Sequence, residues 1–194
     1  MLLMRSQQML TKKTDHPPEV EEPDGLVYVF TGEGKGKTSA GMWTAMRAAL
    51  EGKKVAVIHW YKETRWPTND QKINGLLPNL ADYLMGCGFY KLPTDHAFEN
   101  EHRMAAQAAL AKAVELLTEV EVLVLDEIIN AVADGLLTEE EVSTLIANRG
   151  QTHLVLTGRD ASQDLIDNAD LVTEMKKIKH PFDQGKKAVK GLDF

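Results

Sequence analysis

The chain is poor in the features that mark secreted and membrane proteins. Cys87 is its only cysteine, so no internal disulfide can form, and a reducing compartment is the simplest interpretation. No apolar run approaches the roughly 18 residues that a transmembrane helix needs. The N-terminus also lacks the long apolar stretch and the small-residue cleavage site of a signal peptide. Together these absences predict a cytoplasmic protein without a membrane partner.

Basic residues and nucleophile motifs are scarce as well. Lys and Arg number 22 against 29 Asp and Glu, which gives a net charge of −7. This balance argues against a protein that binds nucleic acid mainly by electrostatic attraction, so no nucleic-acid partner is expected. No G-x-S-x-G or similar nucleophile motif occurs. With 194 residues and 43% hydrophobic content, the chain can nevertheless bury a substantial core.

A phosphate-binding pattern is the most informative feature that is present. Residues 31–38 have the sequence Thr-Gly-Glu-Gly-Lys-Gly-Lys-Thr, between an apolar β-prone run and an Ala/Met-rich stretch typical of a helix. Strand, glycine loop and helix form the context that a P-loop requires, although Thr31 stands where Gly is usual. Backbone amides and the helix N-terminus would face phosphate oxygens. Lys37 is then expected to reach the outer phosphates and Thr38 to bind Mg²⁺; a chance glycine-rich turn is the alternative.

The rest of the chain alternates strand and helix patterns. Residues 64–93 are expected to be rich in loops. Continuous apolar strands separated by helices predict an α/β domain, P-loop NTPase-like (RecA-like), with a mostly parallel sheet and helices on both faces. Ligands of such sheets bind beyond the carboxyl ends of the strands. Strands are predicted at 27–30, 54–61, 120–125, 154–156 and 171–175, and helices at 38–51, 99–117, 138–150 and 162–168.

Two polar motifs stand at predicted strand ends. Asp126 and Glu127 follow an apolar strand, as in a Walker B motif, and could hold Mg²⁺ beside Thr38, although acids at strand ends are also common without a metal. Arg159, in a Thr-Gly-Arg-Asp run, could face phosphate oxygens. The alternative for that run is a plain strand-to-helix turn with Asp160 as the N-cap, and the two interpretations are compatible.

Several other residues favour ordinary structural roles. Arg47 lies nine residues after Thr38, and this spacing alone predicts a charged side chain on the surface and not a ligand contact. His59 on an apolar strand is expected to be a hydrogen-bonded core histidine and not a catalyst. Cys87, His96 and His102 lie within a short span but lack metal-ligand spacing.

The first 24 residues differ from the domain at 25–194. Residues 11–24 are dense in Lys, Glu, Pro and Asp and are expected to form an exposed arm or linker. Residues 1–10 carry enough apolar surface for a short docking helix, and a disordered tail is the alternative.

Strings spread over residues 25–194 resemble one known family, the ATP:corrinoid adenosyltransferases of the CobA/CobO/BtuR type. The C-terminal strings are the most specific, because ordinary P-loop proteins do not share them. The matching strings are Thr31–Ala40, Thr44–Ala48, Val124–Ile128, Thr138–Val142, Leu156–Arg159, Ala169–Glu174, Lys179–Gly185 and Gly191–Phe194.

The resemblance implies an unusual use of a P-loop. In this family the Co(I) of a corrinoid attacks the 5′ carbon of ATP, and inorganic triphosphate leaves, in adenosylcobalamin synthesis or salvage. The implied reactants are ATP and a corrinoid, with Mg²⁺ or Mn²⁺ and an electron-donating flavoprotein or similar reductant. A homodimer is also implied, in which the arm at residues 1–24 covers the site of the partner subunit.

Roles for residues are carried over by motif position. Lys37 and Thr38 would act in catalysis, and Thr38, Asp126 and Glu127 would bind the metal. Phe89 and Tyr90 would contact the corrinoid. Gly88-Phe89 matches a Gly-Phe pair of the family, but Lys91 stands where the family has a second aromatic residue. Tyr90 or Phe98 would take the place of that second aromatic residue. ATP contacts are implied for Gly32, Glu33, Gly34, Lys35, Gly36, Lys37, Thr38, Ser39, Arg47, Lys62 and Arg159.

Alternatives of other classes stay open at this point. Core packing is the alternative role for Phe89 and Tyr90. A P-loop ATPase that couples ATP hydrolysis to a partner's conformational change is the alternative enzyme. A carrier that binds a corrinoid or a nucleotide without turnover is the non-enzymatic alternative.

Overall fold

The architecture is built on one parallel sheet. The computed structural model describes residues 24–65, 68–73 and 75–193. Six strands pair in the order β3-β2-β4-β5-β1-β6, and every pair is parallel. The predicted α/β class is therefore confirmed. The strands are β1 (Val27–Thr31), β2 (Val55–His59), β3 (Leu80–Leu84), β4 (Val122–Asp126), β5 (His153–Thr157) and β6 (Leu171–Glu174).

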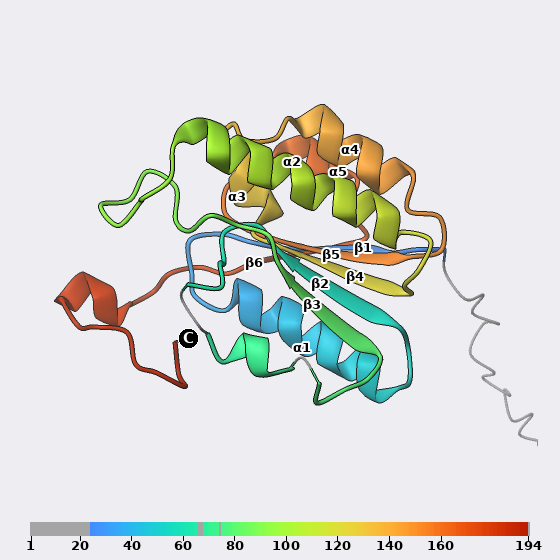
Figure 1. Ribbon diagram of the computed structural model, residues 1–194, viewed down its shortest axis with the longest axis horizontal. Coiled ribbons are helices and arrows are strands. Elements are labelled where there is room, and N and C mark those ends of the chain that lie inside the picture. Colours follow the sequence, from blue (N-terminus) through green and yellow to red (C-terminus); the bar gives the residue numbers. More distant parts are fainter. Residues whose placement is uncertain (1–23, 66–67, 74, 194) are drawn as a thin grey trace, which may run out of the picture.

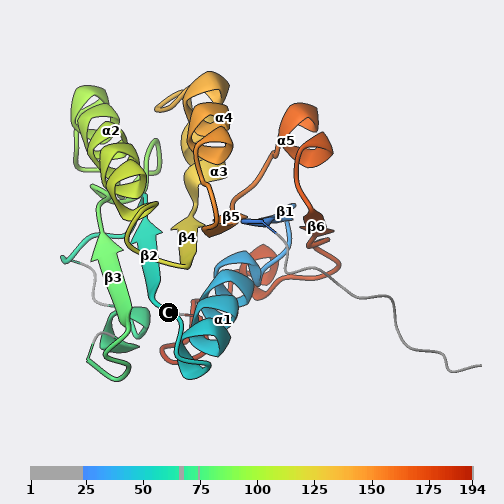
Figure 2. The same ribbon diagram turned by 90° about the vertical axis from the view of Figure 1, so that its right-hand side faces the viewer.

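Helices cover both faces of the sheet, as predicted. α1 lies on one face, whereas α2, α3, α4 and α5 lie on the other (Figures 1 and 2). Within the described residues, no helix combines the length and the apolar character that crossing a membrane would require. The helices are α1 (Lys37–Leu50), α2 (Glu99–Leu116), α3 (Ile128–Ala133), α4 (Glu139–Ala147) and α5 (Gln163–Asp167), with 3₁₀ turns η1 (Asp70–Ile73) and η2 (Pro181–Gln184).

Side chains of the central strands alternate between two cores. On β2, Val55 and Val57 join the core under α1, whereas Ala56 and Ile58 join the core on the opposite face. This alternation follows from the two-residue period of a strand. It places His59, two residues after Val57, on the α1 side of the sheet at the carboxyl end of β2.

Gly41 lets α1 approach the sheet closely. A Cβ atom at this position would lie 3.0 Å from Thr157 Cγ2 and 3.2 Å from Val124 Cγ1. The first turns of α1 therefore rest almost directly on β4 and β5, whose carboxyl ends carry the polar motifs found in the sequence.

The structure corrects several local predictions. The section predicted as loop contains strand β3, which is paired with β2, and α3 follows β4 where no helix was predicted. Asp160 is not the N-cap of α5: its φ of 56° is left-handed, and Ser162 caps the helix by accepting a hydrogen bond from the Leu165 amide. Ser162 is closer to the first helical residue, so its hydroxyl reaches the unpaired amides that a cap must satisfy.

The capping box at α4 supports a test of local stability. Thr138 Oγ1 accepts from the Glu141 amide, and Glu141 Oε2 accepts from the Thr138 amide at 2.7 Å. Replacing Thr138 with Ala removes one half of this exchange, so we expect a loss of about 1 kcal/mol of unfolding free energy. Thermal denaturation should show a melting temperature lower by about 2–4 °C. Thr144→Ala on the exposed side of the same helix is the matched control, and equal effects of the two changes would contradict the capping role.

Candidate functional site

The glycine loop (residues 32–36) joins β1 to α1 at the carboxyl edge of the sheet. Gly32 and Gly36 have φ angles of 93° and 122°, which are strained for any other residue. A Cβ atom at Gly32 or Gly34 would lie 2.7 or 2.6 Å from the Met175 carbonyl oxygen. Glycine is therefore required both by the turn and by the chain that leaves β6.

Lys37 folds back over this loop. Its Nζ donates to the carbonyl oxygens of Gly32 and Gly34, at 2.6 and 2.9 Å. Burial, followed by the nearby charge of Arg159, lowers the pKa of Lys37. The first turn of α1 contains no acidic residue, so nothing there offsets the positive end of the helix dipole. The loop, the lysine and the helix terminus together form a concentrated positive site.

The C-terminal segment is fastened to the glycine loop. The Gly34 amide donates to the Met175 carbonyl oxygen at 2.5 Å. Lys35 Nζ lies 2.8 Å from Asp193 Oδ1, while Asp193 Oδ2 accepts from the Val189 amide. The hydrogen bond from Lys35 lowers the pKa of Asp193. In Figure 1 this red segment lies at the same end of the sheet as the start of α1.

Arg159 stands across the loop from α1. Its Nη1 is 3.3 Å from Glu33 Oε2, and both side chains are exposed. The Arg159 amide donates to Asn130 Oδ1 at 2.6 Å, which fixes the backbone at the end of β5. The structure thus brings the predicted Arg159 beside the loop, where its guanidinium can exchange Glu33 for another anion.

A chain of buried charged side chains links the middle of β3 to the carboxyl ends of β2 and β4. His59 Nδ1 lies 2.6 Å from Asp126 Oδ2, and His59 Nε2 lies 2.8 Å from Asp82 Oδ1. Burial alone would lower the pKa of His59, but its bonds with Asp126 and Asp82 raise that pKa to about 9. The ring is therefore an imidazolium that donates to both acids, which confirms the expectation of a hydrogen-bonded core histidine.

Asp126 is held on every side. It also accepts from Thr157 Oγ1 at 2.8 Å and lies 3.4 Å from Lys62 Nζ. Burial opposes ionisation, but the bond from His59 and the charge of Lys62 hold the pKa of Asp126 well below its usual range. Asp126 is therefore a fixed anion.

Glu127 has the opposite character. Burial, followed by the negative charge of Asp126, raises its pKa to about 7. Its backbone is left-handed, with φ at 67°, and its amide donates to Thr157 Oγ1 at 2.9 Å. The charge of Lys37 acts on Glu127, which places this acid within electrostatic reach of the glycine loop. A cation at this position would relieve the cost of ionising Glu127.

Two basic residues that were predicted to contact ATP, Lys62 and Arg47, lie in different parts of the structure. Lys62 follows β2, and its Nζ lies 3.4 Å from Asp126 Oδ2 at the carboxyl end of β4. Arg47 lies in the last turn of α1, ten residues beyond Lys37 and therefore about 15 Å along the helix. Within one chain the structure does not bring Arg47 to the loop.

The Phe89 loop (residues 88–98) is organised around Asp95. This carboxylate accepts from the amides of Lys91 and Ala97, at 2.8 and 3.2 Å, and lies 2.9 Å from His102 Nε2 on α2. The bond with His102 is the main reason that the pKa of Asp95 falls to about 2. One acid therefore ties the loop to the helix that follows it.

The aromatic residues of this region differ in exposure. Phe89 is 56% exposed and Phe98 is 78% exposed, whereas Tyr90 is only 9% exposed. The Tyr90 ring packs on His102, with ring centroids 5.0 Å apart, and Lys91 Nζ lies 4.5 Å from the Tyr90 centroid. Tyr90 thus has the core-packing role that was the alternative for it, while Phe89 presents its ring to solvent.

Comparison with known proteins matches the sequence of this chain to one family. A profile of the ATP:corrinoid adenosyltransferase BtuR/CobO/CobP family covers residues 23–194. The chain belongs to this family. It is 35% identical to corrinoid adenosyltransferase CobA of Salmonella typhimurium, over 98% of this chain and 96% of that protein. It is 34% identical to a corrinoid adenosyltransferase of Escherichia coli K12, over 97% and 95% of the two chains. A Sinorhizobium corrinoid adenosyltransferase is 36% identical over 88% and 80%.

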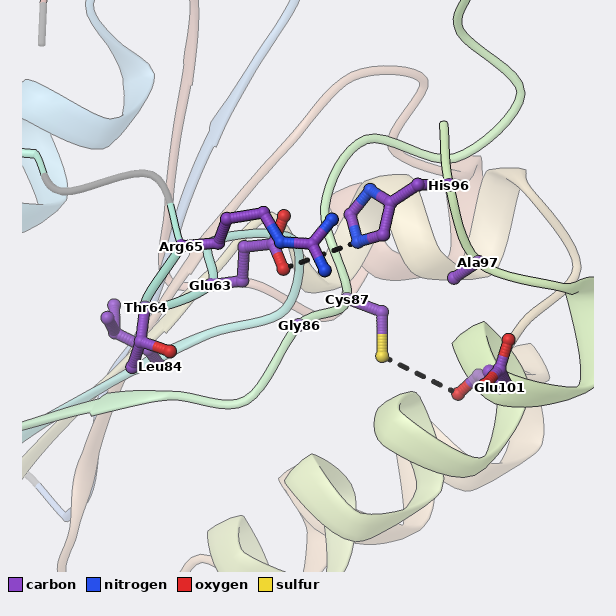
Figure 3. A pocket seen from close by; sticks show the side chains of 9 residues that line it. All are labelled: Glu63, Thr64, Arg65, Leu84, Gly86, Cys87, His96, Ala97 and Glu101. Atoms are coloured by element: carbon purple, nitrogen blue, oxygen red, sulfur yellow. Dashed lines mark hydrogen bonds and ion pairs between the residues drawn. The ribbon is translucent and has the colours of Figure 1, made fainter. Parts of the chain in front are cut away.

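Sequence reasoning missed a cavity in this corrinoid adenosyltransferase. It has a volume of about 400 Å³ and lies beside the Phe89 loop (Figure 3). Glu63 and Arg65, which follow β2, carry no motif that would have singled them out. Within the described residues, no group of three or more His, Cys, Asp or Glu side chains is arranged to hold a metal ion. The lining residues are Glu63, Thr64, Arg65, Leu84, Gly86, Cys87, His96, Ala97 and Glu101.

The buried imidazolium of His59 makes the stability of this protein depend on pH. Folding raises the pKa of His59 from 6.5 to about 9, so the folded protein binds this proton more tightly than the unfolded chain. The contribution is complete below pH 6.5 and is lost as the pH rises through about 9. His59→Gln should lower the unfolding free energy at pH 6 by about 3 kcal/mol, because it leaves two buried carboxylates without their cation. It should also flatten the decline between pH 6.5 and 9 in denaturant titrations.

His96→Gln is the control for this prediction, because that imidazole is 31% exposed and its Nε2 lies 3.5 Å from Glu63 Oε2. An unchanged pH profile in His59→Gln would contradict the assigned charge state.

Proposed function

We propose that this protein transfers the 5′-deoxyadenosyl group of ATP to the Co(I) of a corrinoid and releases triphosphate. The observation that carries the proposal is the family match over residues 23–194, supported by corrinoid adenosyltransferases that align along nearly the full chain. The glycine loop at the carboxyl edge of the sheet supports it independently, since this is where parallel sheets bind nucleotides.

The glycine loop would hold the leaving group of this reaction. Negative charge grows on triphosphate as the bond between C5′ and oxygen breaks, so donors that face the phosphates stabilise the transition state more than the ground state. Lys37 would exchange the carbonyl oxygens of Gly32 and Gly34 for phosphate oxygens. Arg159, Lys62, Lys35, Ser39 and the amides of residues 32–36 complete the proposed contacts near the loop, whereas Arg47, about 15 Å along α1, would contact ATP only away from the loop.

The donor set at this edge fits a divalent cation. Thr38 lies in the first turn of α1 beside the loop, and the raised pKa of Glu127 marks a carboxylate that a cation would stabilise. Mg²⁺ or Mn²⁺ would be held by Thr38, Glu127 and the phosphates, and it would neutralise part of the triphosphate charge. Asp126, whose oxygens are engaged by His59, Thr157 and Lys62, would hold Lys62 in place.

Phe89 would face the corrinoid. An exposed aromatic ring at the corrin's lower face excludes an axial ligand, and loss of that ligand makes reduction to Co(I) easier. A flavoprotein or similar donor would supply the electron. We further propose a cytoplasmic homodimer whose N-terminal arm covers the partner's site; residues 1–23 of that arm lie outside the described part of the chain.

Lys37→Ala tests the role of the loop. We expect adenosylation to fall by at least about tenfold, which corresponds to roughly 1.4 kcal/mol of transition-state stabilisation. The measurement is the rate at which a light-sensitive Co–C product forms from reduced corrinoid and ATP, with triphosphate quantified as the second product. Lys53→Ala, an exposed lysine beyond the far end of α1, is the control. Unchanged turnover would refute the loop's role, and ADP with phosphate as products would favour an ATPase.

Phe89→Ala tests the corrin contact. We expect slower reduction of bound Co(II) with little change in ATP affinity, because the ring would act on the axial ligand and not on the nucleotide. Electron paramagnetic resonance of the bound Co(II) corrinoid would follow the axial ligand directly. Leu92→Ala, a second exposed apolar residue in the same loop, is the control. Equal losses in reduction and in ATP binding would indicate packing as the only role of Phe89.

A further inference from the structure

The C-terminal segment (residues 176–193) begins and ends at the glycine loop. It follows Met175, whose carbonyl oxygen accepts from the Gly34 amide at 2.5 Å. Figure 1 shows the segment turning away from the sheet and returning toward the start of α1. At its far end, Asp193 Oδ1 lies 2.8 Å from Lys35 Nζ. The segment is thus a closed loop that is fastened to the glycine loop at both ends.

The carboxylate of Asp193 is oriented by the turn that carries it. Its Oδ2 accepts from the Val189 amide at 2.7 Å, while the Asp193 amide donates to the Val189 carbonyl oxygen at 2.8 Å. Gly191 permits this turn, because its φ of 83° is left-handed. Asp193 therefore presents its other oxygen, Oδ1, to Lys35 in a fixed direction, and its side chain is only 24% exposed.

Lys35 and Lys37 have different partners. Lys37 Nζ folds over the loop and donates to the carbonyl oxygens of Gly32 and Gly34. Lys35 Nζ instead binds the C-terminal segment. A phosphate would have to displace a charged carboxylate from Lys35 but only neutral carbonyl oxygens from Lys37. The side chain of Lys35 is therefore suited to a tether, while its backbone amide keeps the proposed contact with ATP.

A tether matters at this place because the glycine loop is flexible by composition. Gly32, Gly34 and Gly36 lack the side chains that restrict a backbone, so an unrestrained loop would occupy many conformations. Ordering such a loop on binding lowers affinity, and a preorganised site avoids that loss. Met175 restrains the loop at Gly34, and Asp193 restrains it at the next residue.

We propose that Asp193 is a positioning residue for the nucleotide: through Lys35 it holds the glycine loop in the shape that binds the triphosphate of ATP. This inference rests on the proposed function and adds a residue, far from the loop in sequence, that sets the affinity of the same site. Asp193 contacts no reacting atom. Its loss should therefore weaken ATP binding and leave the chemical step, which depends on Lys37 and Thr38, nearly unchanged.

Lys35→Met/Asp193→Asn is the main test, because it removes the ion pair without changing the net charge beside the phosphates. We expect the dissociation constant of MgATP, measured by calorimetry without corrinoid, to rise about threefold, as for the loss of one partly exposed ion pair. The KM for ATP should rise by the same factor, while kcat at saturating ATP stays within about twofold. Lys177→Met/Asp183→Asn is the matched control: it removes a 3.2 Å ion pair within the same segment and should change neither constant.

Asp193→Asn alone separates a tether from a phosphate ligand. It keeps an oxygen that can accept from the Val189 amide, but it releases Lys35. A tether predicts that MgATP binds at least about twofold more weakly, because the loop is loosened. If Asp193 instead kept Lys35 away from phosphate, this release would leave ATP affinity unchanged or increased. Asp193→Glu retains the carboxylate and should bind MgATP more tightly than Asp193→Asn.

The outcomes separate this inference from the proposed function. Unchanged or tighter MgATP binding in Asp193→Asn would overturn the positioning role, as would equal effects of the two double variants or a fall in kcat larger than the rise in KM. Absence of MgATP binding to the wild-type protein, or of a Co–C product from it, would instead overturn the proposed function.

Discussion

A buried imidazolium between two carboxylates is the interaction on which the site depends. His59 donates to Asp82 in the middle of β3 and to Asp126 at the end of β4, so one side chain joins three adjacent strands. Asp126 in turn accepts from Thr157 on β5 and holds Lys62. The chain of charges therefore runs across four of the six strands. It fixes the edge against which the glycine loop and the substrate-facing loops are built.

The charge balance of this edge explains the contrast between its two neighbouring acids. Asp126 is neutralised by His59 and Lys62 and stays ionised, whereas Glu127 lies beside that anion and has its pKa raised to about 7. One acid is thereby a fixed anion, whereas the surroundings of the other oppose its charge. On the opposite side of the loop, Asp193 binds Lys35, which gives a physical reason for the C-terminal motif: it closes the loop from outside.

Local patterns were predictable from the sequence, and contacts between distant segments were not. The glycine loop, α1, α2 and α4 follow from short-range patterns, and all lie where they were predicted. Strand β3 was missed because an acid, Asp82, interrupts its apolar run, and that acid is there to bind His59. The partners of His59 are 23 and 67 residues away, and no local pattern encodes such a pairing. The cavity at Glu63 was missed for the same reason.

The titratable groups around the site also bear on where the nucleophile comes from. His59 is buried and uses both ring nitrogens, so it cannot accept a proton from a substrate. Tyr61 donates to Asp134, and burial raises its pKa far above neutrality. Burial likewise raises the pKa of the Cys87 thiol, which keeps it protonated and a poor nucleophile. These three side chains are thus engaged or protonated, which agrees with the proposed reaction, in which the nucleophile is the Co(I) of the substrate.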